Sequence, residues 1–341
     1  MKRNTQSENP KSELRSSAAQ SLTKRMFKSI RTKILITVLA AVLSGGLLST
    51  SVSAKARVET IQFRSKLINA TLPYSVALPE DYDDSTTTRY PVLYLLHGLT
   101  GHYNDWFLRT NVADYAAQYR LIVVTPEGND SWYIDSSAVP TEKYESYILN
   151  EIIPDVQARY RTIEARYARA IAGLSMGGYG AIKFGLKTPA TFAFVGSMSG
   201  AFGITRVNAQ GIEWAALKNS LKVFGAVGSD IRKQNDVFEL IKQLPANRIS
   251  SLPFIYFDSG TEDAGVFADN RELAALLVEK KIPHEYRELP GDHSWGYWDR
   301  QVQEVIKIAI RSLNVRPVNE PPRSQTKPVT PIRRAGVTKK N

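Results

Sequence analysis

The sequence predicts an α/β fold with a mostly parallel central sheet and helices on both faces. Short apolar runs alternate with segments of helical spacing between residues 58 and 313, an alternation typical of successive strand–helix units. Several runs, such as Val92–Leu96, are continuously apolar, as expected for strands that are covered on both sides. No internal repeat or linker divides residues 57–314, so we expect one domain.

The expected elements follow one another along the chain. Eight strands are expected, at 58–63, 72–78, 92–96, 121–124, 170–172, 194–196, 254–257 and 285–289. The first two of them are expected to pair antiparallel. Helices are expected at 144–160, from 178 onward, at 272–279 and at 302–313. Pro154 predicts a kink or a break, because proline cannot donate the helical hydrogen bond. Residues 201–250 fit the rhythm poorly and are expected to form an insertion of short helices, a candidate cap over the site.

The positive charge of the chain is concentrated at its two ends. Residues 1–54 carry nine Lys/Arg and two Glu, and residues 315–341 carry seven Lys/Arg and one Glu. Of the total of +11, a net charge of −2 is therefore left for residues 55–314, which argues against a nucleic-acid-binding domain. The C-terminal stretch is rich in Pro, Lys, Arg and Thr, and we expect a disordered basic tail.

The N-terminal segment, 1–54, has the pattern of an export signal. A basic region precedes the apolar run 34–43, a glycine pair breaks that run, and small residues lead up to Ala54. We expect cleavage after Ala54, with Ala56 as a second choice. The alternative is an uncleaved membrane anchor, because residues 34–54 contain no charge over 21 positions. Either interpretation places the domain outside the cytoplasm, secreted or periplasmic.

The content of cysteine and histidine limits the chemistry. The chain has no cysteine, which excludes a disulfide scaffold, a thiolate zinc site and a cysteine nucleophile. Its histidines are His97, His102, His284 and His293, too few to favour a histidine-rich metal site. We expect neither a metal nor an organic cofactor.

A serine in a glycine-rich turn is the candidate nucleophile. The segment Gly173-Leu174-Ser175-Met176-Gly177 follows a short apolar strand and precedes residues that can start a helix. That strand–turn–helix context is what a nucleophile elbow requires, and its glycines leave room for a sharp turn. The Met176 N–H would then point toward a developing oxyanion. The alternative is an ordinary turn with a solvent-facing serine.

His293 is the candidate general base. In this arrangement the nucleophile, the acid and the histidine follow in that order along the chain, which leaves His284 and His293. His293 lies in the loop after the strand 285–289, at the carboxyl end of the sheet where catalytic groups gather. His284 lies at the entry of that strand and is expected to be a surface histidine.

The carboxylate that would orient the histidine is expected in the loop after the strand 254–257. Asp258, Glu262 and Asp263 compete for this role. We favour Asp263, because it lies several residues beyond the strand and after a glycine turn, whereas Asp258 is too close to the sheet. Asp292 is not favoured for this role, because it is adjacent to His293 in the sequence and the side chains of neighbouring residues diverge.

The loop that starts with His97-Gly98 follows a strand and is the usual source of a second oxyanion donor. The Leu99 N–H is the candidate, paired with that of Met176, and His97 is expected to be structural. Trp106 and Trp132 are expected on loops at the same end of the sheet. They are candidates for lining an acyl or sugar pocket, with ordinary packing as the alternative.

Four blocks carry a family resemblance over roughly residues 58–313: Tyr90–Gly98, Gly173–Ala181, Gly260–Asp263 and Pro290–Trp295. They resemble the esterase family within the α/β-hydrolases, which includes bacterial feruloyl and acetyl esterases, S-formylglutathione hydrolase and the mycobacterial mycolyltransferases. The resemblance implies the α/β-hydrolase fold. It supports Ser175, Asp263 and His293 as the catalytic side chains. It also supports the N–H groups of Leu99 and Met176 as the oxyanion donors. The expected export signal weighs against an S-formylglutathione hydrolase role, which is cytoplasmic in the family.

The function expected from these features is that of a serine esterase acting on a small-molecule or carbohydrate ester, such as a short-chain acyl, acetyl or feruloyl ester. It would work through a Ser-His-Asp triad and an acyl-enzyme. Two alternatives stay open: an acyltransferase to a sugar or lipid alcohol, and a non-catalytic α/β-hydrolase that binds a ligand. Contact with a membrane is expected only if the N-terminal segment is retained.

Overall fold

The computed structural model describes residues 56–313. The predicted export signal at 1–54 and the predicted basic tail at 315–341 lie outside the described residues. Within 56–313, no helix combines the length and the apolar character needed to cross a membrane.

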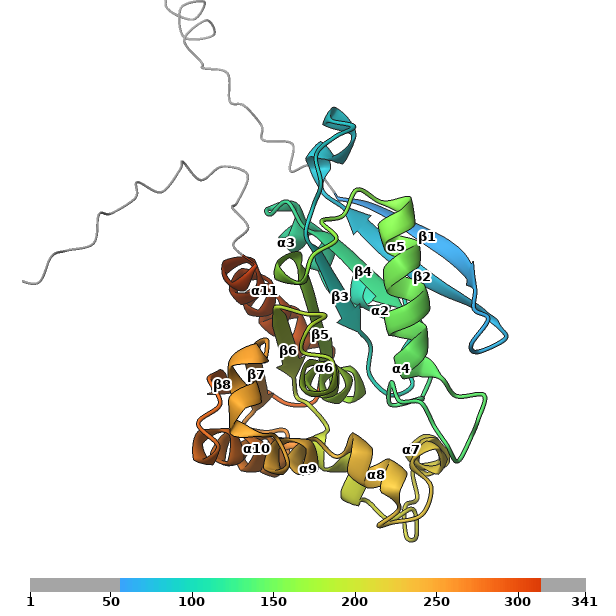
Figure 1. Ribbon diagram of the computed structural model, residues 1–341, viewed down its shortest axis with the longest axis vertical. Helices are drawn as coiled ribbons and strands as arrows, with labels where there is room; N and C mark the ends of the chain where they lie inside the picture. The colour runs from blue at the N-terminus through green and yellow to red at the C-terminus, as the bar shows by residue number, and fades with distance from the viewer. Residues whose placement is uncertain (1–55, 314–341) are drawn as a thin grey trace, which may run out of the picture. The chain divides into compact units, whose positions relative to one another are not determined.

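A single eight-stranded sheet forms the centre, in the order β1-β2-β4-β3-β5-β6-β7-β8 (Figure 1). The strands are β1 (Arg57–Arg64), β2 (Thr71–Leu78), β3 (Val92–Leu96), β4 (Ile122–Pro126), β5 (Arg169–Leu174), β6 (Phe194–Met198), β7 (Phe254–Gly260) and β8 (His284–Leu289). β2 is antiparallel to β1 and to β4, and all other neighbours are parallel. The predicted α/β fold with a mostly parallel sheet is confirmed.

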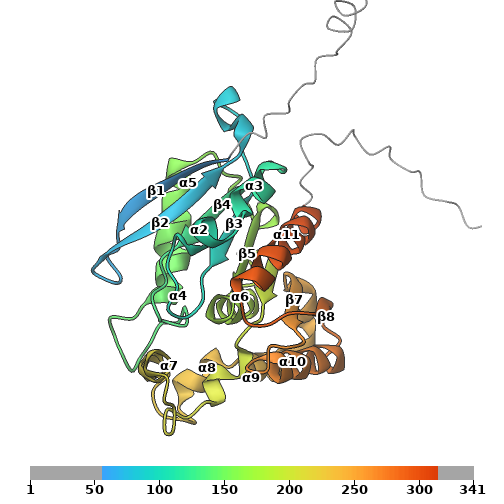
Figure 2. The same cartoon turned by 180° about the vertical axis from the view of Figure 1, so that it is seen from behind.

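Helices cover both faces of this sheet. One face packs against α4 (Tyr144–Tyr147), α5 (Ile153–Arg159), α6 (Met176–Lys187) and α10 (Phe267–Glu279). The other packs against α2 (Asp105–Arg109), α3 (Val112–Ala117) and α11 (Trp295–Ser312), which are seen from the back in Figure 2. Each face therefore has its own apolar core, which explains why the central strands are buried along their whole length.

The segment predicted as a kinked helix at 144–160 is interrupted. α4 is followed by a π-helical stretch, Ile148–Ile152, and then by α5. Pro154 lies in the first turn of α5, where the missing N–H leaves no intrahelical bond unmade. The π turn directly before it absorbs the change in hydrogen-bond spacing.

Two predicted helices begin earlier than expected. α10 starts at Phe267 and α11 at Trp295, whereas the apolar pattern predicted helices from 272 and from 302. The early start of α11 matters for the site, since the loop that holds His293 leads directly into this helix.

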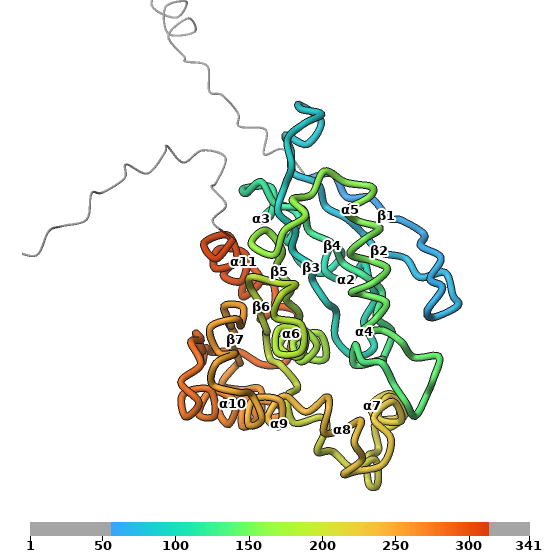
Figure 3. The backbone as a smooth tube through the Cα atoms, viewed as in Figure 1, coloured from blue at the N-terminus to red at the C-terminus, as the bar shows by residue number. Residues whose placement is uncertain are grey.

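Residues 201–250 consist of short helices joined by turns. They comprise the 3₁₀ helices Phe202–Arg206, Leu221–Phe224 and Ala246–Ser251 and the helices α7 (Ala215–Ser220), α8 (Asp230–Asn235) and α9 (Val237–Lys242). Figure 3 follows this segment, in yellow, from the end of β6 to α7, α8 and α9 at the lower end of the view. This segment therefore lies outside the sheet and the two helical layers that cover it.

Candidate active site

Ser175 lies at the sharp turn between β5 and α6. Its backbone has φ 50° and ψ −114°, a combination that a residue with a side chain adopts only under strain. A Cβ on Gly173 would lie 2.5 Å from the carbonyl group of Gly177, and one on Gly177 would lie 2.5 Å from the Leu96 carbonyl oxygen. The turn therefore has the close contacts that were expected of a nucleophile elbow.

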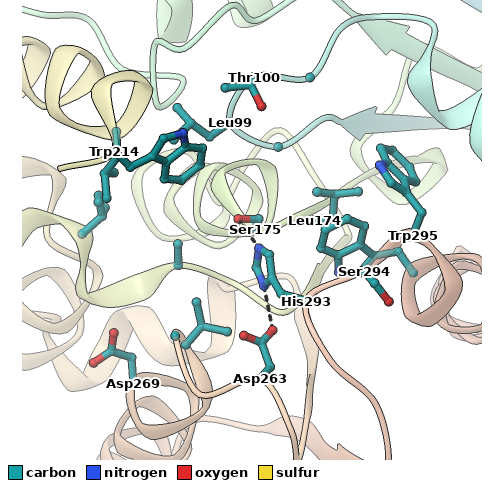
Figure 4. Close-up of a pocket in the computed structure, with 18 of the residues that line it drawn as sticks. Leu99, Thr100, Leu174, Ser175, Trp214, Asp263, Asp269, His293, Ser294 and Trp295 are labelled. Atoms are coloured by element: carbon teal, nitrogen blue, oxygen red, sulfur yellow. Dashed lines mark hydrogen bonds and ion pairs between the residues drawn. The ribbon is translucent and has the colours of Figure 1, made fainter. Parts of the chain in front are cut away.

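Ser175, His293 and Asp263 form a continuous hydrogen-bonded chain (Figure 4). The Ser175 Oγ lies 3.0 Å from His293 Nε2, and His293 Nδ1 lies 2.7 Å from Asp263 Oδ2. A carboxylate can only accept at Nδ1, so Nδ1 carries the proton and Nε2 is free to accept the one from serine. The Asp263 side chain is 2% exposed and that of His293 39% exposed, so the acid is enclosed while the imidazole faces the pocket.

The loops after β7 and β8 bring Asp263 to His293. These strands are parallel neighbours, so their carboxyl ends meet at one edge of the sheet. The Thr261 N–H donates to the Leu289 carbonyl at 2.8 Å, and the Glu262 N–H donates to the Gly291 carbonyl at 2.9 Å. The two loops are thus tied together by backbone hydrogen bonds next to the pair of side chains.

The competing carboxylates lie elsewhere. Asp258 is fully buried inside β7, which continues to Gly260, and accepts a hydrogen bond of 2.7 Å from the Tyr297 hydroxyl. The Glu262 carboxylate accepts from the backbone N–H of Gly291. Neither side chain hydrogen-bonds His293.

The remaining polar candidates also have other partners. The Asp292 carboxylate accepts from the Ser294 hydroxyl and so points away from its neighbour. His284 is the first residue of β8, half-buried, with Nδ1 2.8 Å from the Ile282 carbonyl. It lies at the opposite end of β8 from the loop of His293.

The residues predicted to supply the oxyanion donors lie next to the serine in sequence or in the pocket. Leu99 and Ser175 line the same pocket, and Met176 follows Ser175 as the first residue of α6. His97 is buried at the start of this loop, with Nδ1 2.8 Å from the Gly98 carbonyl and Nε2 accepting from the Gly128 N–H at 2.9 Å. These contacts suit the structural role expected of His97.

A pocket of about 830 Å³ opens above Ser175 and His293. Trp132 forms part of its wall, and the indole N–H of Trp132 donates to Ser220 Oγ at 2.9 Å. The prediction for Trp106 is wrong in two respects: this residue lies in α2 instead of a loop, and it does not line the pocket. Its side chain is fully buried in the core, and its N–H donates to the Leu96 carbonyl at 3.1 Å.

The sequence reasoning missed three tryptophans that line the pocket, Trp214, Trp295 and Trp298. Trp298 packs edge-on against the His293 ring, with centroids 5.0 Å apart. Trp295 lies two residues after His293, a proximity that was a usable signal. Trp214 comes from the 201–250 segment, and Figure 4 shows it on the opposite side of Ser175 from Trp295.

Within residues 56–313, no group of three or more His, Asp or Glu side chains is arranged to hold a metal ion. The polar groups around Ser175 instead pair with one another, as the distances above describe.

Comparison with known proteins decides the family. The family described as "Putative esterase" matches residues 65–307. The chain belongs to this esterase family. It is a carboxylic ester hydrolase of the α/β-hydrolase fold.

Individual relatives agree with this assignment. The esterase is 30% identical over 259 residues to an acetyl esterase of Caldicellulosiruptor saccharolyticus, which covers 72% of this chain and 96% of that protein. It is 34% identical over 252 residues to an esterase of Mycobacterium tuberculosis, covering 68% of this chain but only 54% of that relative, about half its length. A solved ferulic acid esterase matches with a TM-score of 0.66 and 27% identity, covering 76% of this chain and 99% of that one.

Proposed function

We propose that this esterase cleaves its substrates with Ser175 as nucleophile, His293 as general base and Asp263 as the group that orients the imidazole. The observation that carries the proposal is the hydrogen-bonded chain from the Ser175 Oγ through the His293 ring to Asp263, with distances of 3.0 and 2.7 Å. A serine hydroxyl needs such a base to be nucleophilic at neutral pH.

The mechanism follows from these positions. Ser175 Oγ attacks the ester carbonyl while its proton passes to His293 Nε2, and Asp263 stabilises the resulting imidazolium. The N–H groups of Leu99 and Met176 donate to the oxyanion. His293 then protonates the leaving alcohol as the tetrahedral intermediate collapses to the acyl-enzyme. Water, deprotonated by His293, releases the acid and restores the serine.

The proposed substrates are esters of short acyl chains, or acetyl and feruloyl esters of carbohydrates. The pocket supports this class because tryptophan faces can stack on an aromatic acyl group or on a sugar ring. The similarity to proteins named acetyl esterase and ferulic acid esterase supports it further.

The test is steady-state hydrolysis of 4-nitrophenyl acetate, methyl ferulate and an acetylated xylo-oligosaccharide. We expect Ser175→Ala to reduce kcat by about 10³-fold or more, while Ser251→Ala, an exposed serine outside the pocket, retains the wild-type rate. Wild-type kinetics in Ser175→Ala would refute the assignment of the nucleophile.

Hydrolysis and acyl transfer share the same acyl-enzyme and differ only in the nucleophile that resolves it. We propose water as that nucleophile. Product analysis in the presence of a sugar alcohol at high concentration distinguishes the two. Free acid as the main product supports hydrolysis, and an acylated sugar that outweighs the free acid supports transferase activity.

We also propose that the esterase acts outside the cytoplasm, on the basis of the basic and apolar pattern of residues 1–54. Expression of the full chain with cell fractionation and N-terminal sequencing tests this. We expect an exported protein that starts at Lys55. A full-length protein in the membrane fraction would support the anchored alternative, and a soluble full-length protein in the cytoplasm would contradict both.

A further inference from the structure

Two consecutive residues beside the pocket have left-handed backbone conformations. Trp132 has φ 55° and Tyr133 has φ 52°, although neither is glycine. Residues with bulky side chains adopt this region only where the surrounding structure holds them there. Both side chains are buried, and that of Trp132 forms part of the pocket wall. Specific contacts must therefore hold the pair at the edge of the pocket.

Lys183 supplies one of those contacts from the helix that begins directly after Ser175. Its side chain is fully buried in α6, and Nζ donates to the Tyr133 carbonyl at 2.6 Å and to Glu145 Oε2 at 2.5 Å. Burial lowers the pKa of Lys183 to about 8, and the neighbouring Glu145 opposes this shift. Glu145 has a second cation, since Lys187 Nζ lies 2.8 Å from it. The buried Lys183 ammonium group thus binds the backbone carbonyl of Tyr133.

Tyr133 in turn contacts the loop that follows β3. Its hydroxyl donates to the His97 carbonyl at 3.1 Å, and its ring packs edge-on against the His97 imidazole with centroids 5.8 Å apart. The peptide that follows joins His97 to Gly98, and the next residue is Leu99. The contacts therefore run from Lys183 to the backbone segment that presents the Leu99 N–H.

We propose that Lys183 and Tyr133 are positioning residues for the oxyanion site: Lys183 fixes the Tyr133 backbone, and the Tyr133 hydroxyl fixes the loop that carries the Leu99 donor. This inference rests on the proposed function, in which Leu99 donates to the oxyanion. Neither side chain contacts the ester. They act on the rate because the donor must already point at the oxygen when negative charge develops.

The most direct test is Tyr133→Phe, which removes one hydroxyl and keeps the ring. With 4-nitrophenyl acetate we expect kcat to fall about tenfold and KM to stay within twofold, because only a transition-state contact is displaced. Tyr179→Phe is the matched control. It lies on α6, is fully buried, and its hydroxyl donates to the Asn235 carbonyl at 2.7 Å, so it loses the same kind of bond away from the loop.

Melting temperatures of the variants distinguish a loss of donor positioning from a general loss of protein stability. We expect the two tyrosine variants to lose similar thermal stability while only Tyr133→Phe loses kcat. Lys183→Met is the second variant, in which Glu145 keeps its bond to Lys187. We expect it to lower kcat and also to raise KM for a bulky ester, because Trp132 is released together with Tyr133.

Two results would overturn the inference: equal kcat values in Tyr133→Phe and Tyr179→Phe, or a KM increase alone in Tyr133→Phe. Both presuppose an active wild type. An inactive wild-type protein would count against the proposed function instead, so the two failures are distinguishable.

Discussion

At the scale of single residues, Asp258 shows how strongly this fold perturbs a carboxyl group that the proposed chemistry does not use. It is fully buried in β7, and burial raises its pKa to about 7, although the Tyr297 hydroxyl bond acts in the opposite direction. The Tyr256 phenol and Arg287 also act to lower its pKa. The acid is therefore protonated in the folded protein at mildly acidic pH.

The raised pKa sets the sign of a pH effect on stability. The folded protein binds the Asp258 proton more tightly than the unfolded chain, so the stabilisation is complete below the usual aspartate pKa and is lost as the pH rises toward 7. We expect Asp258→Asn, which stays neutral, to gain on the order of 2 kcal/mol relative to wild type between pH 5 and pH 8. Urea unfolding of both proteins at the two pH values measures this. An equal difference in unfolding free energy at pH 5 and pH 8 would contradict it.

At the scale of elements, the turn between β5 and α6 depends on the absence of a side chain at Gly177. A Cβ there would lie 2.5 Å from the Leu96 carbonyl oxygen and 2.6 Å from that of His97. Neither atom belongs to a flexible side chain, so β3 and its outgoing loop would have to move away from α6. This is the same loop that carries the Leu99 N–H.

We therefore expect Gly177→Ala to destabilise the protein by about 1–3 kcal/mol and to reduce kcat as the donor shifts. Gly296→Ala is the control, because a Cβ at that position of α11 meets nothing closer than 3.9 Å. Urea denaturation and esterase kinetics are the measurements. Similar stability and activity in the two variants would show that the close contact is unimportant.

The short helix α7 and the residue before it contribute part of the pocket wall. Trp214 precedes this helix, is 55% exposed and lines the pocket together with Leu217. A side chain so exposed contributes little to the free energy of folding, so its place in the wall points to substrate contact.

We expect Trp214→Ala to raise KM for a feruloyl ester severalfold while kcat/KM for 4-nitrophenyl acetate changes less than twofold. The unfolding free energy should change by less than about 0.5 kcal/mol. Trp106→Ala is the contrasting variant. Its side chain is fully buried, so it should lose about 3–5 kcal/mol of stability. A uniform loss of activity on all esters in Trp214→Ala would argue against a role in specificity.

Much of this element structure could be predicted from the sequence, for physical reasons that vary from element to element. The continuous apolar run Val92–Leu96 matches β3 residue for residue, because a strand buried on both faces needs apolar side chains throughout. The start of α11 was missed, because Gly296 has a low helix propensity and the exposed Gly296 and Arg300 interrupt the apolar pattern. Ser175 and His293, which hydrogen-bond to each other in the structure, were singled out from the glycine-rich turn around Ser175 and from the position of His293 in the loop after the strand 285–289.

The tryptophans that line the pocket were harder to predict from the sequence than the residues hydrogen-bonded in the chain from Ser175 to Asp263. Trp106 and Trp132 have similar local sequence contexts, yet only Trp132 reaches the pocket. The indole of Trp106 turns inward, where the Leu96 carbonyl accepts its N–H. Whether a tryptophan beside a loop faces the core or the pocket depends on a tertiary partner, which no local pattern encodes.

At the scale of the whole molecule, the strong positive charge is separate from the catalytic domain. Residues 55–314 carry a net charge of −2, whereas the segments on either side contribute +7 and +6. Electrostatic attraction to polyanions should therefore follow these segments and weaken with salt. Ester hydrolysis should depend on the domain alone.

We expect residues 55–314, expressed alone, to hydrolyse 4-nitrophenyl acetate with a kcat/KM within twofold of the full chain. The same protein should fail to bind a heparin column at low salt, where residues 55–341 are retained. Equal retention of the two proteins would place the polyanion contact on the domain and contradict this division of charge.

The most direct test of the central claim is the covalent adduct formed with a fluorophosphonate, measured by intact mass and peptide mapping. The account predicts one phosphonyl group per chain, located on Ser175, and labelling that slows at least about 10²-fold in His293→Ala because the serine loses its base. Labelling at another residue, or equally fast labelling of Ser175 in His293→Ala, would contradict it.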